Sequence, residues 1–264
     1  MENRYLRRVG TREFTLKPYA GLIGFFGGVM MFYGFAKAPA FLIAGPIFLV
    51  VALALYVAHT SRPSAVELRL LVDTGNVDEA MIHVLSQLNS TGDSDRKAEL
   101  MLLLGRCAEL LGDFDEAGGV YEAALARASG DAIDELRDRR AFCLAAAGNV
   151  EEARNLLGAA PDRKRPFREN DVTRRPLEVR ARCITAFRSG EHTTVLDLVE
   201  RSRAVVETEL LPIDRSLVFA LEHVAAASLG RTGARLAPLD AATTTWVGRF
   251  IPSIGRYIDG RASE

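Results

Sequence analysis

The chain has 264 residues, of which 48% are hydrophobic, and its 33 basic and 34 acidic side chains give a net charge of −1. From residue 61 onward there are 27 basic and 32 acidic side chains, a net charge of −5. A nucleic-acid binder normally carries a basic surface, so this balance argues against nucleic acid as a partner. Three cysteines without CxxC spacing exclude a disulfide framework and fit a reducing compartment.

The basic amino-terminal segment, 1–17, is followed by an apolar stretch, 18–60, whose single charged side chain is Lys37. A helix needs roughly 20 apolar residues to cross about 30 Å of hydrocarbon, so this stretch is long enough for two. Lys37 and Pro39 interrupt it. The pattern predicts a two-span transmembrane hairpin with helices at about 19–36 and 40–58.

Small residues mark one face of the first predicted span, because Ala20, Gly24 and Gly28 recur every four residues. Such a stripe lets another helix approach closely. Packing against the second span is the simpler interpretation, and homo-oligomerisation through the stripe is the alternative. A cleaved signal peptide is a rival interpretation of the first span, but Pro39 would directly follow the cleavage site and a second span comes after it.

Basic residues flank the predicted hairpin unevenly. Five of them precede the first span, against one in the turn: Arg4, Arg7, Arg8, Arg12 and Lys17. Basic residues concentrate on the cytoplasmic side of a membrane, which predicts that both termini are cytoplasmic. The basic residues are nearly all arginine, a usage typical of GC-rich bacterial genomes. The predicted location is therefore a bacterial inner membrane, with lipid contacts through 18–60.

Glycine followed by a polar residue recurs along the rest of the chain, at Gly75, Gly112, Gly148 and Gly190, with gaps of 37, 36 and 42 residues. Each pair lies between two apolar patterns of helical period. A glycine in the left-handed conformation ends a helix, and the next residues start another. The spacing predicts recurring helix–turn–helix units in an all-α protein.

The best copy of this unit, about 98–131, resembles the tetratricopeptide repeat, whose unit is 34 residues of paired helices. The matching residues are Leu104, Gly105, Gly112, Ala117, Tyr121 and Ala124. The next copy is fair and the flanking two are loose, while Ala108 and Ser129 depart from the family pattern. The resemblance implies an α-solenoid of about four to five helix pairs, assigned here to 61–237, although a related helical-hairpin solenoid is the alternative.

Two further segments each have two interpretations. The proline- and arginine-rich segment 161–176 is interpreted as a solvated loop, with contact to anionic lipid as the alternative. Pro212 is predicted to open a helix that runs through Leu229. The tail, 238–264, is interpreted as a cap on the last repeat, with an amphipathic interfacial segment as the alternative.

No catalytic or metal-binding pattern stands out. The four histidines are isolated, and there is no phosphate-binding loop, dinucleotide fingerprint or nucleophile elbow. Cys107 and Cys143 occupy equivalent places in their repeats, as small packing residues do. The sequence therefore predicts no enzyme, no cofactor and no metal.

The leading interpretation is a membrane-anchored adaptor that binds a protein partner in the concave groove of the solenoid. The resemblance places an arginine-rich set in that groove, suited to acidic ligands: Arg69, Arg106, Arg139, Arg140 and Arg182. On this view, removing Arg106 and Arg140 weakens partner capture without lowering the melting temperature. The alternative function is a structural subunit of a membrane complex that assembles through the glycine-rich hairpin.

Overall fold

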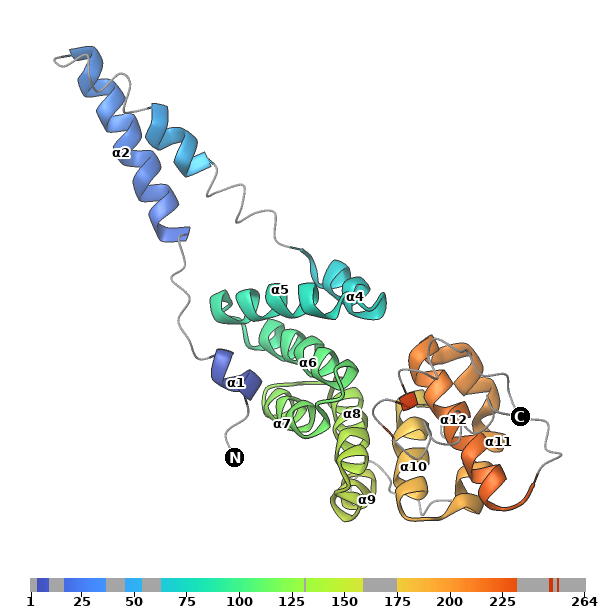
Figure 1. The fold of residues 1–264 in the computed structure, drawn as a ribbon. Coiled ribbons are helices and arrows are strands. Elements are labelled where there is room, and N and C mark those ends of the chain that lie inside the picture. The colour runs from blue at the N-terminus through green and yellow to red at the C-terminus, as the bar shows by residue number, and fades with distance from the viewer. Residues whose placement is uncertain are drawn as a thin grey trace. The chain divides into compact units, whose positions relative to one another are not determined.

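The computed structural model describes residues 4–9, 17–36, 46–53, 63–130, 132–158, 175–231, 247–248 and 251. Within these residues the regular structure is helical and no strand occurs, which confirms the all-α prediction. The chain divides into two compact units, Leu6–Gly92 and a larger one made of Met1–Tyr5 with Asp93–Glu264 (Figure 1).

The helices follow one another in pairs after the apolar stretch. The unit Leu6–Gly92 contains α2 (Lys17–Ala36), a helical segment at 46–53, α4 (Ala65–Asp73) and α5 (Val77–Ser90). The larger unit contains α6 (Ser94–Leu110), α7 (Phe114–Leu125), α8 (Ala132–Ala147), α9 (Val150–Gly158), α10 (Pro176–Arg188), α11 (His192–Glu209) and α12 (Pro212–Ser228). The short helix α1 (Arg4–Val9) begins in the larger unit.

A repeated hydrogen-bond pattern ends the first helix of each pair. The Gly112 amide donates to the Glu109 carbonyl, and the Asp113 amide donates to the Ala108 carbonyl, five residues back. This is the Schellman motif, which requires a residue with positive φ. The same pair of bonds and a positive φ occur at all of these positions: Gly75, Gly112, Gly148, Gly190 and Gly230. The four predicted turns are confirmed, and Gly230 adds a fifth that the spacing did not reveal.

Each helix start also has a local cause. The Ser64 hydroxyl accepts from the Glu67 amide while the Glu67 carboxylate accepts from the Ser64 amide, so a capping box opens α4. Proline opens both α10 and α12, where its missing amide hydrogen costs nothing. The predicted helix from Pro212 is confirmed and ends at Ser228.

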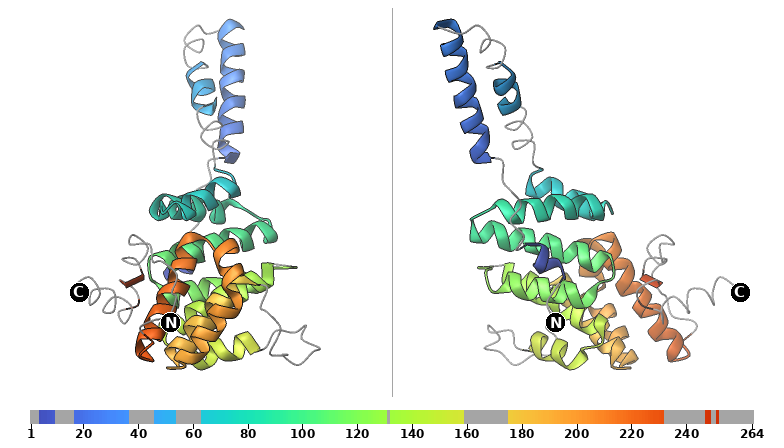
Figure 2. Two further views of the ribbon diagram at one scale, coloured as in Figure 1. Left: turned by 90° about the vertical axis from the view of Figure 1, so that its right-hand side faces the viewer. Right: turned by 60° about the vertical axis from the view of Figure 1, so that its left-hand side comes forward.

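The helix α10 is central in the larger unit, because it packs against α8, α11 and α12 (Figure 2). Its neighbours bury a shared core that includes Phe142 and Leu217. Between α6 and α7 the backbone at Gly105 lies against the ring of Tyr121, since a Cβ added at that glycine would lie 2.4 Å from a ring carbon. The small residue in the predicted Leu-Gly pair therefore has a packing reason.

The amino-terminal residues of α1 contact the second pair of helices. The Tyr5 side chain is buried, and its hydroxyl donates to the Asp113 carboxylate at 2.6 Å. The Arg4 amide donates to a carboxylate oxygen of Glu116 at 2.8 Å, and the Arg4 guanidinium pairs with Asp113. Because these carboxylates lie at the start of α7, the amino-terminal residues belong to the larger unit.

The predicted pair of membrane-spanning helices is not supported by the structure. Among the residues described, none of the helices has both the length and the apolar character needed to cross a membrane. The helix α2 and the segment 46–53 nevertheless lie side by side, and a Cβ added at Gly24 would lie 3.5 Å from the Ala52 Cβ. At Gly28 no atom lies within 4 Å of an added Cβ, and the packing of Ala20 falls outside the described side chains.

Parts of the remaining predictions fall on residues that are not described. These include 37–45 and 54–60 of the apolar stretch and 159–174 of the basic segment. In the tail, the described residues Val247 and Ile251 are both 1% exposed. Both interpretations of the tail stay predictions.

Candidate functional site

Five charged side chains meet inside the larger unit and form what we call the ion cluster. They come from four helices: Arg106 and Glu109 from α6, Arg139 from α8, Arg180 from α10 and Asp214 from α12. None is more than 6% exposed. Charged side chains are rarely buried unless they are paired, so the cluster needs internal partners for every charge.

The contacts within the cluster are short and directional. The Arg106 Nη1 and Nη2 atoms donate to the two Asp214 carboxylate oxygens at 3.0 and 2.9 Å, a bidentate pairing. The Arg180 Nη1 donates to Glu109 at 2.6 Å and also pairs with Asp214. The Tyr121 hydroxyl donates to the other Glu109 oxygen at 2.9 Å. The cluster therefore ties α6, α7, α10 and α12 together.

Arg180 also lies over an aromatic ring. Its guanidinium carbon is 3.9 Å from the centre of the Phe142 ring, within the range of a cation–π contact. The side chain is completely buried, and Phe142 comes from α8. The ring thus covers part of the guanidinium that the two carboxylates leave uncovered.

The electrostatics hold Glu109, Asp214 and Arg180 in their charged forms. Burial alone would raise the pKa of Glu109, but Arg180 and Arg106 outweigh it and the pKa lies below its ordinary value. The pKa of Asp214 is likewise lowered, because Arg106 and Arg180 outweigh burial. The pKa of Arg180 is raised by the same two carboxylates against the effect of burial. Groups fixed in one charge state suit structural pairing rather than proton transfer.

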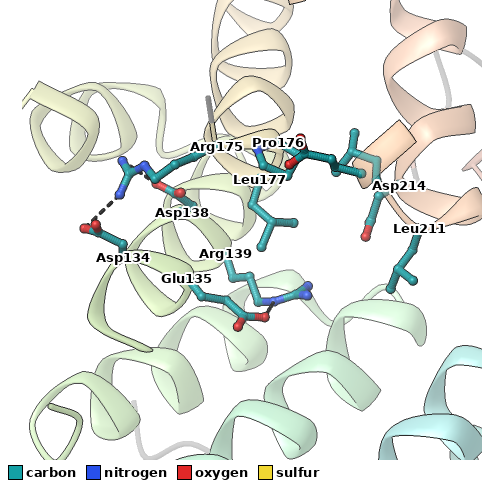
Figure 3. Close-up of a pocket in the computed structure, with 11 residues that line it drawn as sticks. Asp134, Glu135, Asp138, Arg139, Arg175, Pro176, Leu177, Leu211 and Asp214 are labelled. Atoms are coloured by element: carbon teal, nitrogen blue, oxygen red, sulfur yellow. Dashed lines mark hydrogen bonds and ion pairs between the residues drawn. The ribbon is translucent and has the colours of Figure 1, made fainter. Parts of the chain in front are cut away.

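A pocket of about 450 Å³ adjoins the cluster. It lies where the first two turns of α8 and the first turns of α10 and α12 meet the end of α11 (Figure 3). Its apolar wall is Pro176, Leu177, Leu210 and Leu211, and its polar lining is Asp134, Glu135, Asp138, Arg139, Arg175, Glu209 and Asp214. Arg139 and Asp214 belong to both the pocket and the ion cluster, so the pocket reaches the buried charges.

Two arginines organise the polar lining of the pocket. The Arg175 Nη1 atom lies 2.8 Å from Asp134, and its Nη2 atom lies 3.4 Å from Asp138. The Arg139 Nε atom donates to Glu135 at 3.0 Å, and the guanidinium extends toward Leu211. The buried Nη1 atom of Arg139 has no hydrogen-bond partner. The nearest carboxylate oxygen recorded for it, on Glu109, is 3.7 Å away.

Asp138 is the pocket group whose ionisation changes near neutral pH. Its side chain is 2% exposed, and burial raises the pKa of its carboxyl to about 7, with Glu178 and Asp134 adding to the rise. The raised pKa means that the folded protein binds a proton more tightly than the unfolded chain does. Folding stability from this group therefore falls as pH rises from about 4 to about 7.

Replacing Asp138 with asparagine is expected to remove that part of the pH dependence. The variant should gain stability relative to the original protein as pH rises through this window, by at most about 1.4 kcal/mol per pH unit. Urea unfolding at pH 5 and pH 8 measures the difference. If the free energies of unfolding of the two proteins differ by the same amount at pH 5 and at pH 8, the pKa of the Asp138 carboxyl is not raised in the folded protein.

Comparisons with protein families, curated proteins and solved structures gave no match to this chain. The function must therefore be argued from the geometry. Among the described residues no group of side chains is arranged to hold a metal ion. The cysteines at 107, 143 and 183 are buried and form no disulfide with one another, and burial raises the pKa of Cys183 to about 12. A thiol in that state is a packing residue rather than a nucleophile.

The five arginines predicted for the partner groove lie in different surroundings. Arg69 is exposed on α4, in the other unit. Arg106 and Arg139 are buried members of the ion cluster. Arg140 bridges Glu122 of α7 and Glu152 of α9, and Arg182 pairs with Glu178 on its own helix. Of the set, Arg139 alone lines the pocket.

The burial of Arg106 changes one expectation from the sequence. Removing Arg106 with Arg140 was expected to leave the melting temperature unchanged, as for residues in an open groove. Arg106 is 3% exposed and donates two of the three hydrogen bonds that Asp214 accepts, the third coming from Arg180, so its removal leaves a buried carboxylate poorly paired. Loss of one partner from a buried pair is destabilising. We therefore expect the double variant to melt at a lower temperature.

Sequence reasoning missed Glu109, Arg180 and Asp214. A signal was present for the first of these, because Arg106 and Glu109 are three residues apart inside an apolar run of α6. Residues at that spacing face the same side of a helix. An opposite-charge pair on the apolar face indicates a buried ion pair. No comparable opposite-charge pair on an apolar face indicates the burial of Arg180 on α10 or Asp214 on α12.

Proposed function

We propose that this protein is an interaction adaptor whose helix pairs bind a segment of another protein and whose apolar stretch attaches it to a membrane. The observation that carries the adaptor function is the pocket, which is formed by the amino-terminal turns of three alternate helices, α8, α10 and α12, and the end of α11. Concave surfaces on stacked helix pairs suit extended protein segments. Glu109, Asp214 and Arg180, which their partners hold in the charged form beside the pocket, support a binding role over a catalytic one.

We also propose that the helix pairs form a tetratricopeptide-like solenoid. Two observations support this assignment: the Schellman turn recurs at five glycines, and Gly105 lies against Tyr121 where the family places a small residue. The second helix of one pair packs on the first helix of the next at α7 with α8, and α8 packs directly on α10. Such stacking of neighbours is how repeats bury a continuous core.

Exposed apolar side chains support the membrane attachment. On α2, the Phe25 and Phe32 side chains are 69% and 79% exposed, and on 46–53 the Val50 and Leu53 side chains are 65% and 61% exposed. Soluble proteins rarely leave a contiguous apolar surface of this kind uncovered. The contact of Gly24 with Ala52 favours packing within the hairpin over assembly with other subunits.

A photo-cross-linking residue placed at Glu209, in the full-length protein in cells, tests the adaptor function. Glu209 is exposed and lines the pocket, so we expect a discrete adduct with a second protein. Glu200 is the matched control, because it is an exposed glutamate on the same helix. Nine residues at 3.6 per turn place it on the opposite face, where no adduct is expected. Equal adducts at both sites, or none at Glu209, would refute the proposal.

The second arm of this experiment tests the membrane attachment. Phe32→Arg combined with Val50→Arg should move the protein and its adduct from the membrane pellet to the supernatant. An arginine in the middle of a bilayer costs about 2.5–3.5 kcal/mol on insertion scales. Val66→Arg is the control, because Val66 is 78% exposed on α4, outside the apolar stretch. If the double variant Phe32→Arg/Val50→Arg stays in the membrane pellet as the control does, the apolar stretch does not attach the protein to the membrane.

A further inference from the structure

Resting on the proposed adaptor function, we infer that the pocket between α8, α10, α11 and α12 receives a basic side chain, arginine or lysine, from the partner segment. This inference reverses the acidic ligand that the arginine-rich sequence suggests. The arginines deep in the larger unit have their charges balanced by buried carboxylates. The charged groups that line the pocket and remain available to a ligand are mainly carboxylates.

The balance of charge at the pocket decides the sign of the ligand. Five carboxylates and two guanidinium groups line it. Glu209 lines the pocket, is exposed, and forms no ion pair within the described part of the chain. Asp138 has a single recorded contact, the 3.4 Å approach of Arg175, which is itself shared with Asp134 and Glu178. A ligand cation would therefore find under-compensated carboxylates at two depths.

The raised pKa of the Asp138 carboxyl also favours a positively charged ligand. Burial with incomplete pairing raises the pKa of its carboxyl to about 7, so the folded protein holds this group charged only at a cost. A guanidinium or ammonium placed beside it would offset that cost. An anion at the same point would add to the repulsion from Glu178 and Asp134, which already act on this carboxyl.

The unpartnered atom of Arg139 specifies a second feature of the ligand. Its buried Nη1 donor has no hydrogen-bond acceptor, and leaving a buried donor unsatisfied is unfavourable. Glu135 and Asp214 already line the pocket near this guanidinium, so an acceptor without charge fits better than another anion. A peptide carbonyl is such an acceptor, and a peptide with a basic side chain supplies both groups at once.

The apolar wall completes the match to a long basic side chain. Pro176, Leu177 and Leu211 line one part of the pocket, beside the carboxylates. Lysine and arginine bury their methylene stems against apolar surface while the charged group meets polar partners. A short polar ligand would use the carboxylates and leave this wall uncovered.

Binding of short fluorescent peptides to the full-length protein in detergent, measured by anisotropy, tests this inference. Three peptides of equal length carry arginine, glutamine or glutamate at the same two positions. We expect only the arginine peptide to bind. Glu209→Gln and Asp138→Asn should each weaken it by about threefold or more, because each change removes one negative charge that faces the bound arginine. Glu200→Gln, on the opposite face of α11, should leave the affinity within about twofold.

Two outcomes would overturn the inference. Equal loss in Glu200→Gln and Glu209→Gln would assign the binding to the general negative charge of the protein, and preference for the glutamate peptide would reverse the ligand class. The chain's own basic residues, Arg163, Lys164 and Arg165, are the competing occupant. Replacing all three with glutamine should leave the peptide affinity unchanged, and a tighter complex would assign the pocket to that segment instead.

The outcome for the ligand class can be separated from the outcome for the adaptor. A protein adduct at Glu209 without arginine-peptide binding would retain the adaptor and reject the basic ligand. Peptide binding that depends on Glu209 and Asp138, with no protein adduct in cells, would retain the ligand class and reject the adaptor.

Discussion

Replacing Arg180 with methionine is expected to lower the free energy of unfolding by about 3–5 kcal/mol, the usual cost of breaking a buried ion pair from one side. Arg180 is completely buried and donates to both Glu109 and Asp214. Methionine keeps most of the volume but leaves two buried carboxylates with less positive charge nearby. Denaturant unfolding measures the loss directly.

The pH dependence of that loss identifies its cause. The lowered pKa values of Glu109 and Asp214 give stability that is present above their ordinary pKa and is lost as pH falls. Because the variant lacks much of this contribution, its deficit in the free energy of unfolding should shrink as pH falls below about 4. Arg154→Met is the control, since the Arg154 side chain is 42% exposed and its surface pairs are worth at most about 1 kcal/mol. A constant deficit across pH would indicate lost packing instead.

Gly105→Ala is expected to lower the free energy of unfolding by about 1–3 kcal/mol, the usual cost of overpacking a core. The new methyl group would lie 2.4 Å from a carbon of the Tyr121 ring. That ring is completely buried, and its hydroxyl is held by Glu109, so it cannot move aside without breaking a bond to the ion cluster. Urea unfolding of the two proteins at one pH measures this cost.

Gly118→Ala is the opposite case on the next helix. A Cβ at Gly118 would meet the Cys143 Cβ at 3.7 Å, an ordinary contact. Alanine is a better helix former than glycine by up to about 1 kcal/mol, so this change should be neutral or stabilising. If both glycine variants behave alike, the close approach of α6 and α7 at Gly105 is not as described.

The helices were predictable because their signals are local. A turn that requires positive φ favours glycine at one position, so it can be recognised from a single residue. The spacing of the glycines predicts the turns at Gly75, Gly112, Gly148 and Gly190. The fifth, at Gly230, was missed because its following residues lack the apolar pattern of another helix pair. The start of α12 at Pro212 was found from proline chemistry.

The site was less predictable, because its residues come together across long separations. Arg106 and Asp214 are 108 positions apart, and no periodicity links them. The sequence marks arginines on helices but does not tell whether each faces solvent or a buried carboxylate. An α-helix turns by 100° per residue, so a small register error exchanges these two environments. That is why Arg106 was assigned to an open groove although it is buried.

The contacts of Arg4 and Tyr5 with the start of α7 also restrict the path of the chain. The polypeptide leaves the larger unit after Tyr5 and rejoins it at Asp93, so both ends of the intervening 6–92 segment are fixed to the same body. Any bilayer that this segment enters must then be crossed an even number of times. A single crossing would place Tyr5 and Asp113 in different aqueous compartments and break the hydrogen bond between them. For a segment that does enter a bilayer, one tyrosine hydroxyl would therefore fix the parity of the crossings, without reference to the hydropathy of the segment itself.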